Sequence, residues 1–262
     1  MKSFISKIKS LKTEIIVAGI IRTLFVLSII VSLINKNYMN AFIAAFTLFL
    51  TFLPFIIARK SQINLPPSFQ IVILMFIFAA NYLGELKFFY EKYWWWDKML
   101  HTLSGIILGF AGFLLIYIIN GEKRLKLNLS PFFVALFSFT FALSMGALWE
   151  IYEFTMDSLF GFNMQRSSLN DTMWDLIVDT VGAIIACTYG FIYEKNRRDG
   201  IFKKLFLKFI KLNQHIFNDN IFIDNTIDKN IINENHIIEK MKGEKAEKHN
   251  GYSKRGHNKR KG

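Results

Sequence analysis

Six apolar runs, each close to the length that crosses a bilayer, constrain this chain more than any other feature of its sequence. A membrane-spanning helix needs about 20 mainly apolar residues. The chain is 52% hydrophobic and contains 28 Phe, which a soluble domain of this size would not need. The sequence therefore predicts an all-α fold, a polytopic membrane helix bundle of about six transmembrane helices. The predicted spans are 15–34, 41–58, 71–83 with an extension toward 90, 99–119, 131–149 and 176–193.

The distribution of Lys and Arg between the spans predicts that both termini are cytoplasmic. Positive side chains gather in the short cytoplasmic loops of multi-pass proteins. Segments 1–13, 59–70 and 121–130 are rich in Lys and Arg, whereas 35–40 and 158–170 carry one each. We therefore expect a multi-pass protein of a bacterial cell (cytoplasmic) membrane, with the lipid bilayer as its main partner.

The chain divides by composition into a predicted transmembrane bundle, 1–195, and a basic cytoplasmic tail, 196–262. Residues 201–217 alternate apolar and basic side chains at helical spacing, which predicts an amphipathic helix on the inner leaflet or, alternatively, packed on the cytoplasmic loops. Residues 240–262 are almost free of apolar side chains and are predicted to be disordered. The net charge of +12 lies largely in this tail. Because the tail is also rich in Asn and Ile, we attribute part of its basicity to compositional bias and expect no nucleic-acid partner.

Acidic side chains and one histidine interrupt three of the apolar runs. An ionised acid at mid-membrane costs about 2.5–3.5 kcal/mol on insertion scales, so such residues usually have a function. Spacings of three or four residues place each set on one helix face. With both termini inside, all three sets lie in the outer half of the membrane, as a single site requires. The sets are Asp97 with His101, Glu150 with Glu153, and Asp171 with Asp175 and Asp179.

Carboxylates with one imidazole are a ligand set for a divalent metal ion such as Mg, Mn, Fe or Zn. The single Cys187 excludes both an intrachain disulfide and a cysteine-based metal site. Such an ion activates water or polarises a phosphoryl oxygen, which suits a lipid-linked substrate or an envelope precursor. The predicted roles are metal ligation by Glu150, Glu153, Asp175 and Asp179, catalysis by His101 oriented by Asp97, and substrate contacts by Gln165 and Arg166 of the loop 158–170.

Two other interpretations of the same residues remain open. The acids and His101 suit a proton relay or a cation pathway in a proton- or cation-coupled transporter. They also suit a purely structural network, in which acids and histidine hydrogen-bond to one another and fix helix register. Asp157 and Asp171 fit best as interfacial residues, with Asp171 also as a cap of the last span.

The same motifs resemble those of a known group. Asp97-Lys98-x-x-His101, then Glu150-x-x-Glu153, then the run from Asp171 to Gly182-Ala183 resemble the YjdF-type family of uncharacterised bacterial inner-membrane proteins. They also resemble the VanZ-like core pattern, but Glu153 stands where that pattern favours Gln. The resemblance covers about residues 70–195. It implies a multi-pass bacterial membrane protein and carries no assigned reaction.

Overall fold

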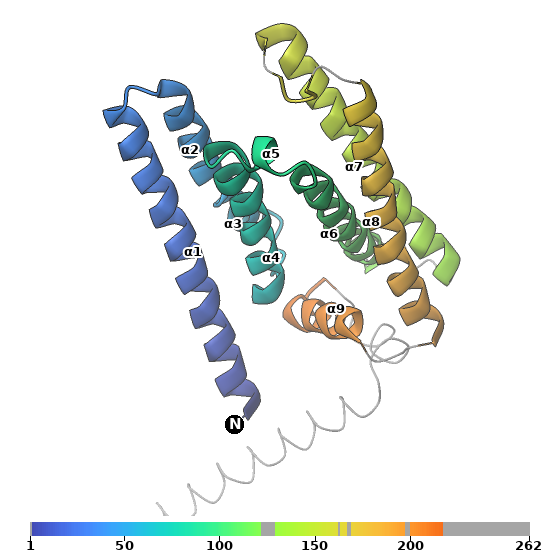
Figure 1. Ribbon diagram of the computed structural model, residues 1–262. Coiled ribbons are helices and arrows are strands. Elements are labelled where there is room, and N and C mark those ends of the chain that lie inside the picture. Colours follow the sequence, from blue (N-terminus) through green and yellow to red (C-terminus); the bar gives the residue numbers. More distant parts are fainter. Residues whose placement is uncertain (1, 122–128, 162, 167–168, 197–199, 217–262) are drawn as a thin grey trace, which may run out of the picture. The chain divides into compact units, whose positions relative to one another are not determined.

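The computed structural model describes residues 2–121, 129–161, 163–166, 169–196 and 200–216, and every regular element in these ranges is helical (Figure 1). The predicted all-α fold is therefore confirmed for the described chain. Six helical stretches are long and apolar enough to cross a membrane, as predicted. They are Thr13–Ile34, Tyr38–Lys60, Pro67–Leu86, Trp96–Asn120, Pro131–Phe160 and Leu169–Asn196.

The orientation of the termini and the division at residue 195 stay predictions. The basic residues of 122–128 and the tail end 240–262 lie outside the described residues. The fifth and sixth spans are longer than predicted, because their acidic ends continue as helix instead of ending at the first charge.

The second span is interrupted by a proline, as its sequence indicates. The first span belongs to a continuous helix, α1 (Lys2–Ile34), and the second divides into α2 (Tyr38–Leu50) and α3 (Leu53–Lys60). Pro54 lies in the first turn of α3, where its missing N–H costs nothing. α1 packs against α2 in this part of the chain.

The break between α2 and α3 also gives Arg22 a partner. Its guanidinium donates to the hydroxyl and the carbonyl of Thr51 at 3.2 and 3.1 Å. The same group lies over the ring of Phe52, 4.0 Å from the centroid. An arginine within an apolar span is therefore stabilised by backbone and aromatic groups at the end of the neighbouring helix.

The third span changes from α-helical to π-helical geometry. α4 (Pro67–Ile77) continues as the π-helical segment η1 (Phe78–Leu86), a rare geometry that often occurs at functional sites. A left-handed residue, Phe88, then turns the chain into the short helix α5 (Phe89–Lys92). Together η1 and α5 bring the chain to the start of the fourth span.

The last three spans are α6 (Trp96–Gly121), α7 (Pro131–Phe160) and α8 (Leu169–Asn196), and they pack closely on one another (Figure 1). They contain all the predicted site residues except the two in the loop, Gln165 and Arg166. Successive spans run in opposite directions. The start of α6, the end of α7 and the start of α8 therefore lie at the same end of this group of helices.

Glycines permit the close approach of these three helices. A Cβ on Gly105 would collide with the backbone carbonyl of Asp179, and one on Gly182 would collide with the backbone carbonyl of Thr102. α6 and α8 therefore meet backbone to backbone at the depth of the acidic residues. On α7, a Cβ on Gly146 would lie 2.6 Å from the Asp179 carboxylate, so the third helix also leaves room for that side chain.

A final helix, α9 (Ile201–Leu212), lies within the predicted amphipathic segment 201–217. Its apolar face is buried in the protein: Phe206 is 0% exposed and contacts aromatic side chains of α6 and α8. Asn213 accepts from the backbone N–H of Asn64 at 2.6 Å and donates to the Asn64 carbonyl at 2.8 Å. Part of the apolar face therefore packs on α6 and α8, and the placement of this helix at the inner leaflet stays a prediction.

Candidate functional site

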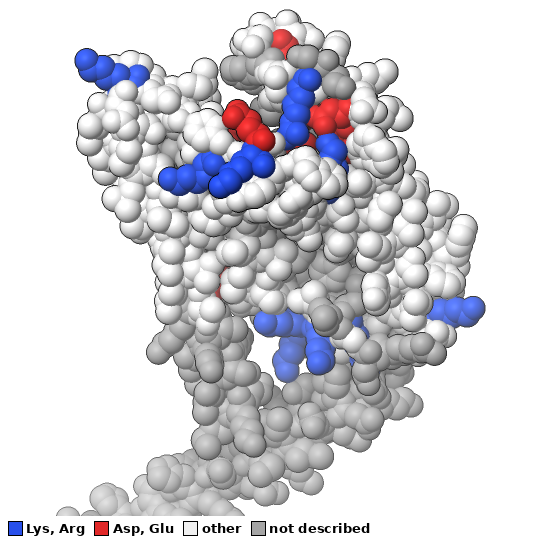
Figure 2. All heavy atoms as spheres, viewed as in Figure 1, with Lys and Arg blue, Asp and Glu red and all other residues white. Residues whose placement is uncertain are grey.

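The acidic residues of α6, α7 and α8 converge on His101 at one end of these helices. Figure 2 shows acidic side chains gathered toward one end in that view, with Lys and Arg among them. Glu150, Asp175 and Asp179 are 2–4% exposed, and His101 is 8% exposed. These side chains therefore face the helix contact rather than the surrounding lipid.

The imidazole of His101 is held between two sets of carboxylates. Its Nδ1 lies 3.2 Å from Oδ2 of Asp179, whose other oxygen accepts from the Ser104 hydroxyl at 2.7 Å. Its Nε2 faces Asp97 at 3.8 Å and Glu150 at 4.0 Å. Such a carboxylate on one ring nitrogen fixes the tautomer and leaves the other nitrogen for a ligand.

Asp97, His101 and Asp175 form a group with the spacing of metal ligands. One ligand atom from each lies within 4.8 Å of the others. The three side chains come from the first turns of α6 and from the buried face of α8. Sequence spacing alone could not pair them, because Asp97 in α6 and Asp175 in α8 are separated by the whole of α7 and by two connecting segments.

Lys98 compensates part of the negative charge. Its Nζ lies 2.6 Å from Asp171, 3.4 Å from Asp175 and 3.9 Å from Asp97. Asp171 was expected to be an interfacial residue or a helix cap; it lies in the first turn of α8, and its bond to Lys98 also connects it to the site. Lys98 was not among the predicted site residues, although its position next to Asp97 made it a candidate.

The carboxylate of Glu150 is buried without a hydrogen-bond partner. Neither of its oxygens has one among the described residues, whereas Oδ1 of Asp175, also without a hydrogen bond, lies 3.4 Å from Nζ of Lys98. A buried polar group left unsatisfied costs about 1–3 kcal/mol, and more when it is charged. This corner of the site therefore has acceptor atoms that a bound cation or a protein-bound proton would satisfy.

Residues 163–166, between α7 and α8, lie beside the site. Asp157 accepts the backbone N–H groups of Met164 and Gln165 at 2.7 and 2.9 Å, which fixes the loop. The Gln165 amide donates to Thr172 at 2.9 Å. Arg166 donates to the Tyr90 carbonyl at 3.0 Å, and its guanidinium lies 3.8 Å from Asp97.

Tyr90 of α5 belongs to the rim of the site. Burial, with Asp97 and Glu85 nearby, raises the pKa of its hydroxyl above the ordinary value for tyrosine. Tyr90 is therefore neutral across the physiological range and remains a hydrogen-bond donor. Through Tyr90, η1 and α5 contribute to the site, and this contribution was not predicted from the sequence.

Two of the predicted residues take other positions than those expected. Glu153 accepts from the indole of Trp149 at 2.9 Å on its own helix, and the structure gives it no ion pair with His101. Asp179 binds the ring nitrogen of His101 that points away from Asp97. The hydroxyl of Ser104 was missed, although its three-residue spacing from His101 placed it on the same helix face.

The fold and this site define a multi-pass α-helical membrane protein with a buried His/carboxylate cluster between its last three spans. The chain belongs to the family described as "Predicted membrane protein (DUF2238)", which matches residues 17–196. The expected YjdF-type membership is consistent with this family, whereas the VanZ-like family is not shown by any of the comparisons.

An uncharacterized protein of Thermotoga maritima is 30% identical over 131 residues. That match covers 50% of this chain and 66% of the relative, so the chain spans just under two thirds of the relative's length. No solved structure matches the chain.

Proposed function

We propose that the His/carboxylate cluster binds a divalent metal ion and acts on a lipid-linked substrate or an envelope precursor in a bacterial cytoplasmic membrane. The buried Glu150 carboxylate carries this proposal, because both of its oxygens lack hydrogen-bond partners among the described residues. It lies beside Asp97, His101 and Asp175, whose ligand atoms have metal-site spacing.

Charge balance supports a cation at this position. Five carboxyl groups surround the site, and within the described parts of the chain Lys98 and Arg166 are the Lys and Arg side chains at ion-pair distance from them. A divalent ion would reduce this imbalance in a region with a low dielectric constant. The five are Asp97, Asp171, Asp175, Asp179 and Glu150.

The proposed ligands are Asp97, His101 through Nε2, Asp175 and Glu150. Oxygen ligands with one imidazole suit Mn²⁺, Fe²⁺ or Zn²⁺ better than Mg²⁺, which prefers oxygen ligands and water. Two assignments differ from the sequence expectations. Asp179 orients His101 instead of binding the ion. Asp97, which was predicted to orient His101, is instead assigned as a metal ligand. Glu153 is left out of the ligand set.

The residues around the ligands suit a phosphorylated substrate. Lys98 and Arg166 are about a fifth and a third exposed at their side chains, so an anionic group approaching from the loop could reach both. A bound metal ion supplies a Lewis acid for a phosphoryl oxygen or an activated water. If the termini are cytoplasmic as predicted, this substrate comes from the outer leaflet.

Metal analysis of the purified full-length protein tests the proposal. We expect stoichiometric metal after reconstitution with Mn²⁺ or Zn²⁺, and loss of that metal in the double variant Glu150→Gln, Asp175→Asn. The exposed acid Glu91 of α5 supplies the matched control, since Glu91→Gln should retain the metal.

Two results would overturn the metal site. The parent protein could remain metal-free in detergent and in liposomes at millimolar metal. Alternatively, the double variant could bind as much metal as the parent. Proton flux into liposomes that the double variant abolishes would instead favour the transporter interpretation, and loss of folded yield alone would favour the structural network.

A further inference from the structure

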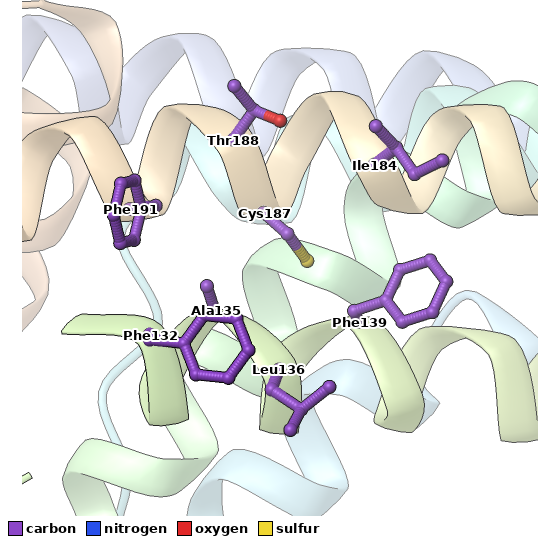
Figure 3. A pocket seen from close by; sticks show the side chains of 8 residues that line it. All are labelled: Phe132, Ala135, Leu136, Phe139, Ile184, Cys187, Thr188 and Phe191. Atoms are coloured by element: carbon purple, nitrogen blue, oxygen red, sulfur yellow. The ribbon is translucent and has the colours of Figure 1, made fainter. Parts of the chain in front are cut away.

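An apolar groove opens between α7 and α8, away from the His/carboxylate cluster (Figure 3). Its volume is about 320 Å³, in the lower part of the range for small-ligand pockets. Figure 3 shows α7 side chains on one side and α8 side chains on the other, with the sulfur of Cys187 directed between them. The lining residues are Phe132, Ala135, Leu136, Phe139, Ile184, Cys187, Thr188 and Phe191.

The groove is separate from the site described above. It extends from Phe132, near the start of α7, to Phe139, seven residues further along, which is about 10 Å of helix. Glu150 lies eleven residues beyond Phe139, or about 16 Å along the same helix. The groove therefore occupies the opposite half of these two spans.

Positive charge marks the end of the groove that lies at the membrane surface. Lys195 is one turn beyond Phe191 on α8, and its exposed ammonium lies 5.8 Å from the Phe191 ring centroid. The N-terminus of α7, capped by the hydroxyl of Ser130, carries the positive end of a 30-residue helix at the same level. The neighbouring acid Glu194 is half-buried and already interacts within the protein.

We propose that this groove binds one acyl chain of an anionic phospholipid, with the phosphate beside Lys195 and the start of α7. The groove is apolar along its length and ends in positive charge, which matches the chemistry of a phospholipid from tail to headgroup. Phe132 at the mouth is 67% exposed on a membrane-spanning helix, so lipid reaches the groove directly. A second copy of the chain would fill the apolar part but would leave the charges at its end without a partner.

Native mass spectrometry of the full-length protein in mild detergent tests this site with phosphatidylglycerol and with phosphatidylcholine of the same chain length. We expect one phosphatidylglycerol to bind more tightly than phosphatidylcholine. Lys195→Gln should weaken phosphatidylglycerol binding about fivefold, the effect of one basic residue at a membrane surface. Lys204→Gln, at an exposed lysine of α9, should leave it unchanged.

A second pair of variants tests the apolar part of the groove. Ala135→Trp, which fills the groove, should remove phosphatidylglycerol binding, and Val181→Trp on the exposed face of α8 should retain it. Should Ala135→Trp not fold, Lys195→Gln still decides the question.

Equal binding of both lipids, or binding that Lys195→Gln leaves unchanged, would overturn the proposal. A dimer mass that rises with protein concentration and carries no bound lipid would also overturn it, because the occupant would then be a second copy of the chain.

Discussion

Replacing Gly146 by alanine should disturb His101, although Gly146 is not one of the proposed metal ligands. Gly146 lies on α7, four residues before Glu150. The added Cβ would lie 2.6 Å from Oδ2 of Asp179, whereas ordinary contact begins at 3.4 Å. The carboxylate oxygen must therefore move by about 0.8 Å, or the helices must separate.

The size of the effect follows from the bond that this oxygen makes. Oδ2 of Asp179 lies 3.2 Å from Nδ1 of His101, so the shift exceeds the margin to the hydrogen-bond limit of about 3.5 Å. Losing a hydrogen bond to a charged group costs about 1.5–3 kcal/mol. Alanine returns about 0.5–1 kcal/mol through its better helix propensity. We expect a net loss of about 1–2 kcal/mol in the free energy of unfolding.

Thermal unfolding in dodecyl maltoside micelles measures this loss of stability. For a protein of this size, each kcal/mol lost lowers the Tm by about 2–4 °C. Metal affinity should fall about 10- to 100-fold, as for other changes to groups that orient a metal-binding histidine. Gly19→Ala is the control, because nothing lies within 4 Å of its Cβ position in α1. A Gly146→Ala protein that retains the parent Tm and metal affinity, while Asp179→Asn loses both, would refute the reasoning.

Four further outcomes follow from the structure. Glu150→Gln should raise the Tm of the metal-free protein, because it removes a buried carboxylate without hydrogen-bond partners, and a Tm as low as that of Glu150→Ala would contradict this. Chelation with EDTA should lower the Tm of the metal-loaded parent but not that of His101→Ala. Calorimetric titration with Mn²⁺ at several pH values should show affinity falling toward acid pH, because protons compete for the carboxylates and the imidazole. Asn213→Ala should release α9 and speed tryptic cleavage, since it removes the two hydrogen bonds by which the buried Asn213 side chain holds the backbone of Asn64, whereas the exposed Gln214→Ala should not.

Several features of the fold could be predicted because they depend on local sequence. Six spans follow from apolar length, and the division of the second span follows from Pro54. The π-helical geometry of 78–86 could not be predicted, because nothing in its composition separates it from an ordinary helix. The burial of the α9 apolar face was also beyond the sequence, since an amphipathic pattern fits a membrane surface and a protein surface equally.

The candidate site was partly predictable for a similar reason. Helical spacing places Asp175 and Asp179 on one face, but it does not say which contacts the histidine. In the structure Asp179 binds Nδ1 of His101, while Asp175 lies with Asp97 near the other side of the cluster. Glu153 has a spacing as suitable as that of Glu150, yet it bonds to Trp149 on its own helix.

The sequence by itself determined that the described chain has six helices long and apolar enough to cross a membrane, with acids in the last three, because hydrophobic length and charge are properties of each segment alone. Only the tertiary structure decided which acids meet. The Gly105 and Gly182 crossing sets the distance between α6 and α8, and Gly146 leaves space for Asp179 beside His101. Those contacts depend on the rotation and spacing of whole helices, which no single segment encodes.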